Sequence, residues 1–128
     1  MAWDLTDAEY EETIKLSPED RYGYFVDKVI EHGKVWSLRN EEGWVLGEAT
    51  EDIEAIPVWP HPRYAEVCAT GPWAYHDAEA IDLKIILERY VPGMMNDHRV
   101  FAVFEVVDGP ALVVPADAVG EDLDISVE

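Results

Sequence analysis

Three prolines alternate with large residues in the segment Ile56-Pro57-Val58-Trp59-Pro60-His61-Pro62-Arg63. Each proline restricts its own φ angle and disfavours the helical region for the residue before it, so the backbone has few paths through this segment. An apolar run precedes the segment and a helix-compatible sequence follows it, which predicts a strand that turns directly into a helix. The corner would bring Trp59, His61 and Arg63 close together, so it is the first place to look for a site.

The candidate binding residues come from this corner and from the aromatic segment 72–81: Trp59, His61, Arg63, Trp73 and His76. Proline-rich turns with exposed aromatic side chains can form a small pocket or a protein-binding rim. The simpler interpretation, which we favour, is structural, with the prolines setting the corner and Trp59 filling the core beneath it. For Arg63 we expect an ion pair with Glu66, and a contact with an acidic ligand group is the alternative.

The chain is strongly acidic, with 28 Asp and Glu residues against 9 Lys and Arg residues and a net charge of −19. Residues 1–12 contain five acids and no base, and residues 117–128 contain the same numbers. This charge argues against binding nucleic acid or an anionic membrane, because both present phosphate groups. A basic protein partner would suit it, although solubility or adaptation to high salt explains the charge more simply.

Length and composition predict one folded domain. The chain has 128 residues, of which 48% are hydrophobic, so it can build a core. Its apolar runs fall far short of the roughly 20 residues that span a bilayer, and its start lacks a secretory signal, so we expect a cytoplasmic location. The single cysteine, Cys68, excludes an intrachain disulfide, and we expect it to be a small buried side chain.

The first half of the chain predicts two helices followed by strands. Thr6 begins a short helix over about 7–14, and Ser17 with Pro18 begins a clearer helix over about 18–32 that Gly33 ends. The runs 35–38 and 43–48 predict a hairpin around a turn at 40–43, with Trp36 and Trp44 packing across it. A third strand follows at 53–58, where Pro57 indicates an edge strand or a strand end.

The second half predicts alternating helices and strands. A helix at 62–69 is followed by an irregular loop at 72–81 and by a helix that Asp82 caps and Pro92-Gly93 breaks. A strand at 100–106, a turn at 108–110, a strand at 111–114 and a last helix beginning at 115–117 complete the chain. Hairpins without repeated βαβ units indicate a single-domain α+β fold. We expect a mainly antiparallel sheet of about five strands with helices packed on one face. Residues 1–16 form an acidic N-terminal arm with a possible short helix, 17–122 the α+β domain and 123–128 an acidic tail.

No motif predicts catalysis or a cofactor. The sequence lacks G-x-S-x-G and H-E-x-x-H, and its glycines are scattered, so no phosphate-binding loop is recognisable. The clusters at 76–79 and 97–98 contain possible metal ligands, but loop polarity explains both. We therefore expect no catalytic residues, no metal and no cofactor.

Four segments of the sequence resemble a known family: Lys34-Val35-Trp36-Ser37-Leu38, Glu42-Gly43-Trp44, Ile56-Pro57-Val58-Trp59-Pro60 and Ala80-Ile81-Asp82-Leu83. The similarity is to the bacterial family catalogued as domain of unknown function 2750, and it covers about residues 17–122. The resemblance implies a bacterial, stand-alone α+β protein, and it brings no catalytic residues to carry over. The strand-to-helix corner is also loosely similar to SseB-type N-terminal domains, where a strand that ends in Pro-Val-aromatic leads into a helix. Here Pro60-His61-Pro62 replaces the polar helix start of that family, so the likeness is architectural only.

Two hypotheses for function remain. The leading one is a non-enzymatic protein-interaction module, immunity-like or an adaptor. The alternative is a small-molecule binding protein or an unrecognised enzyme with a pocket at the Trp59–Arg63 junction. The alternative requires His61 and Arg63 to converge on a concave site, whereas side chains that fill the core or point apart would contradict it.

Overall fold

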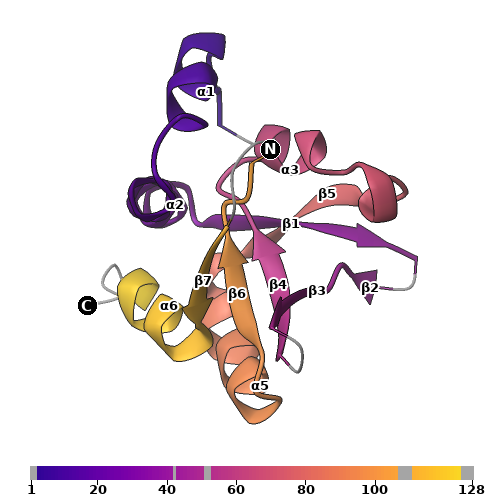
Figure 1. Cartoon of the computed structure of the whole chain (residues 1–128). Coiled ribbons are helices and arrows are strands. Elements are labelled where there is room, and N and C mark those ends of the chain that lie inside the picture. The colour runs from indigo at the N-terminus through magenta and orange to yellow at the C-terminus, as the bar shows by residue number, and fades with distance from the viewer. Residues whose placement is uncertain (1–2, 42, 51–52, 107–110, 125–128) are drawn as a thin grey trace.

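The fold is known from a computed structural model that describes residues 3–41, 43–50, 53–106 and 111–124 (Figure 1). Its helical elements are α1 (Asp7–Thr13), α2 (Pro18–His32), α3 (Pro62–Val67), the 3-10 turn η1 (Gly71–Trp73), α4 (Leu83–Ile85), the π turn η2 (Ile86–Tyr90), α5 (Val91–Asn96) and α6 (Ala116–Leu123). Its strands are β1 (Lys34–Asn40), β2 (Gly43–Trp44), β3 (Gly47–Thr50), β4 (Ile53–Val58), β5 (Asp77–Asp82), β6 (Val100–Val103) and β7 (Leu112–Pro115).

The strands of the described residues form two sheets, ordered β2-β1-β5 and β3-β4-β6-β7. Every pairing is antiparallel except β4 with β6, which run parallel. The backbones of Trp36 and Trp59 join the sheets by two hydrogen bonds of 2.9 and 2.8 Å. The expected α+β class and mainly antiparallel pairing are therefore confirmed, but the strands are divided between two sheets where we expected one.

The predicted starts of α1 and α2 are confirmed by their caps, whereas Asp82 precedes α4 without the side-chain capping hydrogen bond that we expected. The Ser17 side chain accepts a hydrogen bond from the Asp20 amide, and the Thr6 side chain accepts one from the Glu9 amide. At the other end of α2, Gly33 has a φ of 73°, a left-handed conformation that glycine adopts without a steric penalty. These three short-range signals explain why α1 and α2 begin and end close to the predicted positions.

The segment 72–81, expected to be an irregular loop, instead contains the 3-10 turn η1 and the strand β5. Strand β5 pairs with β1 along its whole length, from Lys34 opposite Asp82 to Arg39 opposite Asp77. Its sequence, Asp-Ala-Glu-Ala-Ile-Asp, has weak strand propensity, which is why the pattern suggested a loop. Backbone pairing with β1 outweighs that local preference.

The helix that begins after Asp82 does not stop at Pro92-Gly93, as expected, but continues through α4, η2 and α5 to Asn96. A proline inside an α-helix lacks the N–H donor, and its ring clashes with the carbonyl one turn earlier. Here the wider π turn Ile86–Tyr90 lies immediately before α5, whose second residue is Pro92. The changed hydrogen-bond spacing of a π turn lets the chain remain helical across the proline.

Three smaller strand predictions also need correction. The run 43–48 is split into β2 and β3, which belong to different sheets. Because Arg39 is the residue opposite Trp44, Trp36 does not pack across the hairpin as we expected. Strand β6 ends at Val103, where Phe104 takes a φ of 60°. The turn predicted at 108–110 and the end of the acidic tail, 125–128, lie outside the described residues.

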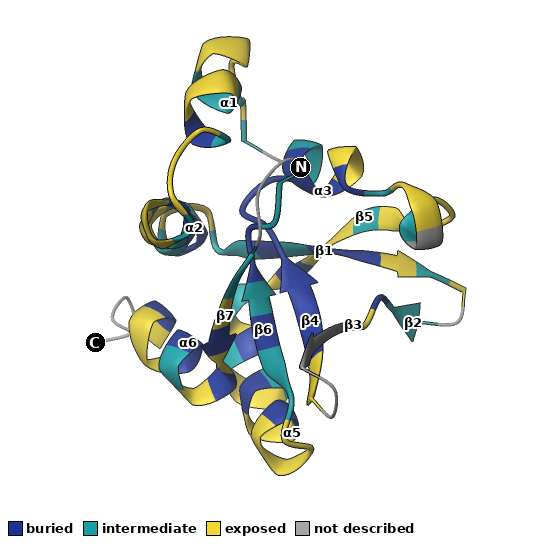
Figure 2. Ribbon diagram, viewed as in Figure 1, coloured by how far each residue is buried: buried dark blue, intermediate teal, exposed yellow. Residues whose placement is uncertain are grey.

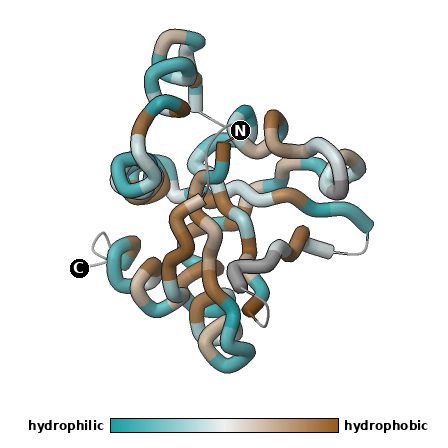
Figure 3. The backbone as a smooth tube through the Cα atoms, viewed as in Figure 1, coloured by the Kyte–Doolittle hydropathy of each residue, from teal (hydrophilic) through white to brown (hydrophobic). Residues whose placement is uncertain are grey.

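The core lies around β4 and β6, whose buried residues are dark blue in Figure 2, and apolar residues also follow β6 and β7 in Figure 3. The central position of β4 is tolerated because Pro57 stands one residue from its end, as the sequence suggested. Arg21 is 3% exposed and donates to the carbonyls of Phe104 at 3.0 Å and Leu16 at 2.5 Å. Among the described residues, no helix has both the length and the apolar character needed to cross a bilayer.

Candidate functional site

Trp59 fills the core beneath the proline corner. Its side chain is fully buried, and its Nε1 donates a 2.8 Å hydrogen bond to the Glu105 carbonyl. Its ring and that of Trp73 meet edge to face, with 6.4 Å between ring centroids. The favoured structural interpretation of Trp59 therefore fits its position, and no face of this indole is open to a ligand.

His61 is buried and both of its ring nitrogens are engaged within the chain. Its Nδ1 accepts a 3.1 Å hydrogen bond from the Arg63 amide and so caps α3, and its Nε2 lies 2.7 Å from the Trp3 carbonyl. These partners assign the neutral tautomer with the proton on Nε2. Burial, the largest cause, holds the pKa of His61 below its usual value.

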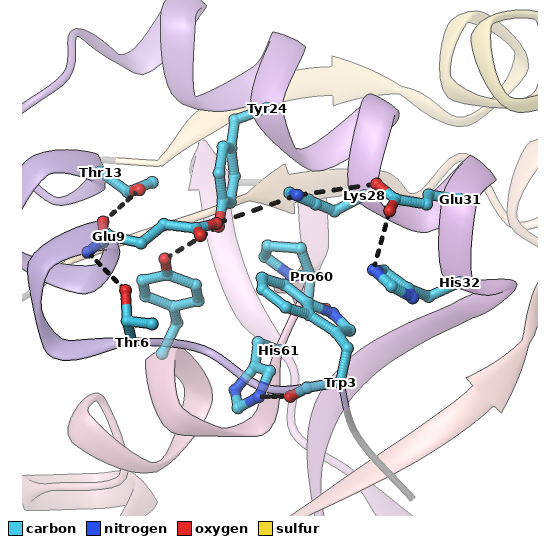
Figure 4. Close-up of polar contacts among 11 residues, drawn as sticks. Trp3, Thr6, Glu9, Thr13, Tyr24, Lys28, Glu31, His32, Pro60 and His61 are labelled. Carbon is cyan, nitrogen blue, oxygen red and sulfur yellow. Dashed lines mark hydrogen bonds and ion pairs between the residues drawn. The ribbon is translucent and has the colours of Figure 1, made fainter.

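Trp3 closes the corner from outside, as Figure 4 shows. Its ring stacks on His32 at 5.0 Å between centroids, and its Nε1 donates to the Pro60 carbonyl at 3.2 Å. Lys28 Nζ lies 5.0 Å from the centroid of the same ring. The N-terminal segment thus covers His61 and leaves it no access to a ligand.

Arg63 points away from His61 toward α1. Its Nη1 lies 2.7 Å from Asp7 Oδ1, in place of the expected pair with Glu66, and its guanidinium carbon lies 4.1 Å from the Tyr10 ring centroid. None of the three cavities that we describe, all lined by described residues, includes Trp59, His61 or Arg63 in its lining. This placement argues against the pocket that the alternative hypothesis put at the Trp59–Arg63 junction.

A mainly apolar cavity of about 260 Å³ lies between α1 and α3, lined by Tyr10, Ile14, Lys15, Tyr64, Val67, Cys68 and Val106. Cys68 is 8% exposed, which confirms the expected buried side chain. Burial raises the pKa of its thiol to about 11, and its Sγ lies 3.4 Å from the Glu105 carbonyl. Because the thiolate is the nucleophilic form, this protonated thiol is unsuited to catalysis at neutral pH.

Two further cavities share Trp44 and Leu46 as walls, and together we call them the Trp44 site. The smaller measures about 370 Å³ and is lined by Asn40, Gly43, Trp44, Val45, Leu46, Trp73 and His76. The larger measures about 400 Å³ and is lined by Trp44, Leu46, Ile56, Arg89, Tyr90, Gly93, Met94, Asp97 and Arg99. The structure thus brings Trp73 and His76 together in the lining of one cavity, and that lining does not include Trp59, His61 or Arg63.

Strand β2 and the π turn position the central side chains of the Trp44 site. Trp44 Nε1 donates a 3.0 Å hydrogen bond to the Tyr90 hydroxyl, and the two rings meet edge to face at 6.5 Å. On β1, Arg39 stands opposite Trp44, with its guanidinium carbon 5.2 Å from the Trp44 ring centroid. π turns occur frequently at functional sites, and this one presents Arg89 and Tyr90 to the larger cavity.

Cationic groups gather at the Trp44 site although the chain carries a net charge of −19. Arg99 is neutralised by Glu54 at 3.1 Å and Asp97 at 3.6 Å. Arg89 is exposed and makes no ion pair with any described residue. An uncompensated guanidinium beside aromatic walls is suited to an acidic ligand group.

Sequence reasoning missed Trp44, Leu46, Arg89 and Tyr90 as members of one site. Trp44 was assigned to the hairpin, and Tyr90 falls in the helix predicted after Asp82 without being singled out. Their approach depends on how the π turn packs against β2, which no local motif encodes. In the part of the chain that the structure covers, no three His, Cys, Asp or Glu side chains are grouped to hold a metal ion.

Comparison with known proteins identifies the family. Residues 22–123 match the family described as "Protein of unknown function (DUF2750)", and because this match covers most of the chain, the protein belongs to that family. No curated protein and no solved structure gives a significant match. The looser likeness to SseB-type domains therefore finds no support in these comparisons. The N-terminal segment that carries Trp3 and α1 lies outside the matched residues.

Proposed function

We propose that this member of the DUF2750 family is a non-enzymatic interaction module, immunity-like or an adaptor, that docks a partner protein over the Trp44 site. The observation that carries the proposal is the pair of cavities on either side of Trp44, of about 370 and 400 Å³. Leu46 lines both cavities and is 41% exposed, so a large apolar side chain stands at the surface where they meet. Aromatic and arginine side chains around apolar pockets are the usual anchors of protein interfaces.

The acidic surface supports a partner whose contact surface is mainly basic. The exposed carboxylates of Glu41, Asp77 and Glu88 each stand next in sequence to a residue that lines the Trp44 site. Carboxylates at the rim of an interface steer a basic partner toward it and raise the association rate at low salt. The same charge disfavours nucleic acid and anionic membranes as partners.

We also place the protein in the cytoplasm. Support comes from Cys68, a buried free thiol in a chain without a second cysteine, which suits a reducing compartment. Fractionation of the native organism tests this assignment, and recovery outside the cytoplasmic fraction would contradict it.

The docking proposal is tested by capture from the native organism at several salt concentrations. We compare the wild-type protein with Leu46→Asp, which places a charge between the cavities, and with the control Leu16→Asp. Leu16 is 36% exposed and lies outside the lining of the Trp44 site, so the control makes the same change on a comparably exposed side chain.

The expected result is a stoichiometric protein partner that Leu16→Asp retains and Leu46→Asp loses. Retention by both variants would overturn the assignment of the docking surface. If no stoichiometric partner binds the wild-type protein at any salt concentration, the proposal that the protein is an interaction module is wrong.

A small-molecule binding function is the second candidate, moved from the corner to the Trp44 site. The size of the two cavities favours it, because ligand pockets are commonly about 300–1,000 Å³. A ligand that binds only the folded state raises the thermal midpoint of unfolding. A metabolite panel screened by thermal unfolding therefore tests it, with the expectation that Leu46→Asp abolishes any shift. Absence of any shift in the wild-type protein counts against this candidate.

A further inference from the structure

We propose that the larger cavity of the Trp44 site binds an acidic side chain of the partner together with the large apolar side chain beside it in sequence. This inference rests on the proposed docking function and adds the chemistry of the anchoring residue. It concerns the cavity of about 400 Å³ that Trp44, Tyr90 and Arg89 line.

Arg89 supplies the charge that would bind the carboxylate. Its side chain is exposed on the π turn, and it makes no ion pair with the described residues. A guanidinium group presents paired N–H donors whose geometry matches a carboxylate, which makes such contacts both strong and orientation-dependent. Arg89 is thus a cation in a strongly acidic chain with an open cavity beside it.

Tyr90 supplies a second donor in the same wall. Its hydroxyl oxygen accepts the 3.0 Å hydrogen bond from Trp44 Nε1, which leaves the hydroxyl proton to donate elsewhere. No other hydrogen bond of this hydroxyl joins it to a described residue. Arg89 and Tyr90 are consecutive residues that both line the cavity, so one carboxylate can accept from both.

The other charged groups around this cavity form one cluster, in which Arg99 contacts two carboxylates. Arg99 contacts Glu54 at 3.1 Å and Asp97 at 3.6 Å, so Arg99 is already paired and Asp97 is not an isolated anion. Arg89 is therefore the charged lining residue that makes no ion pair with a described residue, and its guanidinium favours an anionic group over a cationic one.

The remaining walls are apolar and call for an apolar side chain beside the carboxylate. Ile56 and Met94, which are 7% and 4% exposed, line the cavity together with Trp44 and the exposed Leu46. A small free carboxylate would leave these apolar walls exposed to water. A protein segment with neighbouring acidic and apolar residues would contact both Arg89 and the apolar walls. The surrounding surface can still be basic, to match the exposed carboxylates at the rim.

The test uses two synthetic peptides with blocked ends, one centred on Leu-Asp-Leu and the other on Leu-Asn-Leu. Both are titrated to millimolar concentrations into the nitrogen-labelled full chain, and binding is followed by the indole N–H signal of Trp44. We expect saturable shifts, with the Asn peptide binding about tenfold more weakly, since a hydrogen-bonded charge is replaced by a neutral amide.

Two exposed residues on the same helical segment provide the matched variants. Arg89→Gln should bind both peptides equally, whereas the control Lys84→Gln, whose residue does not line the cavity, should keep the preference for Asp. Equal binding of the two peptides by the wild-type protein, or no saturable shift of the Trp44 signal, would overturn the acidic anchor.

Partner capture separates this inference from the docking proposal. If Leu46→Asp abolishes capture while Arg89→Gln leaves it unchanged, the docking surface stands and the acidic anchor is wrong. If Leu46→Asp leaves capture unchanged, the docking surface itself is wrong, whatever the peptides do.

Discussion

Replacing Trp59 with Phe tests whether the proline corner is a structural element or a ligand site. Phe keeps an aromatic ring at the fully buried position but removes the Nε1 donor and part of the indole. The Glu105 carbonyl then loses its 2.8 Å hydrogen bond and keeps only the weak contact of the Cys68 thiol. The variant therefore isolates the indole's contribution to folding without changing any exposed surface.

The expected loss of unfolding free energy has two parts. Weakening the hydrogen bonding of a buried carbonyl costs about 1–2 kcal/mol. The smaller ring leaves a cavity of about 40 Å³, and at about 24 cal/mol per Å³ this costs about 1 kcal/mol. Together they predict a loss of about 2–3 kcal/mol, measured by urea unfolding as a lower midpoint with an unchanged slope.

Trp73→Phe is the matched control, because it makes the same change on the neighbouring indole. Trp73 is only partly buried, and its Nε1 donates no hydrogen bond to the described residues, so the expected loss is below about 1 kcal/mol. A Trp59→Phe loss no larger than that of Trp73→Phe would refute the structural role that we assign to the corner.

Three further changes probe the contacts around this corner. Arg21→Met should lower the free energy of unfolding by about 3–5 kcal/mol in urea titration, because the buried Phe104 carbonyl and the partly buried Leu16 carbonyl lose a charged donor. A loss below about 1 kcal/mol would contradict this prediction. Burial lowers the pKa of His61, so below a pH of about 6.5 the unfolded state binds more protons than the folded state, and the free energy of unfolding should fall as the pH falls toward 5. In His61→Asn, which keeps a capping side chain, unfolding measured against pH should show a shallower decline than in the wild type. An equal decline would exclude His61 as its source. Arg63→Ala should change the unfolding midpoint only slightly, by less than about 1 kcal/mol, since its pair with Asp7 is exposed; a larger loss would show that this pair holds α1 in place.

Local sequence signals predicted the parts of the fold that depend on local chemistry. Ser17 and Gly33 delimit α2 because a capping side chain and a left-handed glycine act within a few residues. The proline corner before α3 was predicted for the same reason. Strand β5 and the continuation of the helix past Pro92 were missed, since each depends on a neighbouring element that overrides the local preference.

The candidate site divides in the same way. Trp73 and His76 were identified as candidates from an aromatic segment, and the structure places them in one cavity of the Trp44 site. His61 was also a candidate, but Trp3, 58 residues away in the sequence, covers it. Residue spacing predicts neither the contact of Trp3 with His61 nor the cavity that Arg89 lines, because both form between elements that are distant in the chain.

The amino-acid sequence by itself determined the α+β class, the acidic surface, the ends of α2 and the proline corner, because composition, capping and restricted φ angles act on neighbouring residues. Only the tertiary structure decided that Trp59 fills the core, that two sheets meet at Trp36 and Trp59, and that Trp44 separates two cavities. The physical reason is that the burial of a side chain and the pairing of its charge both depend on which elements pack against it. The unpaired Arg89 that lines a cavity with Trp44 is such a property, and the proposed acidic anchor depends on it.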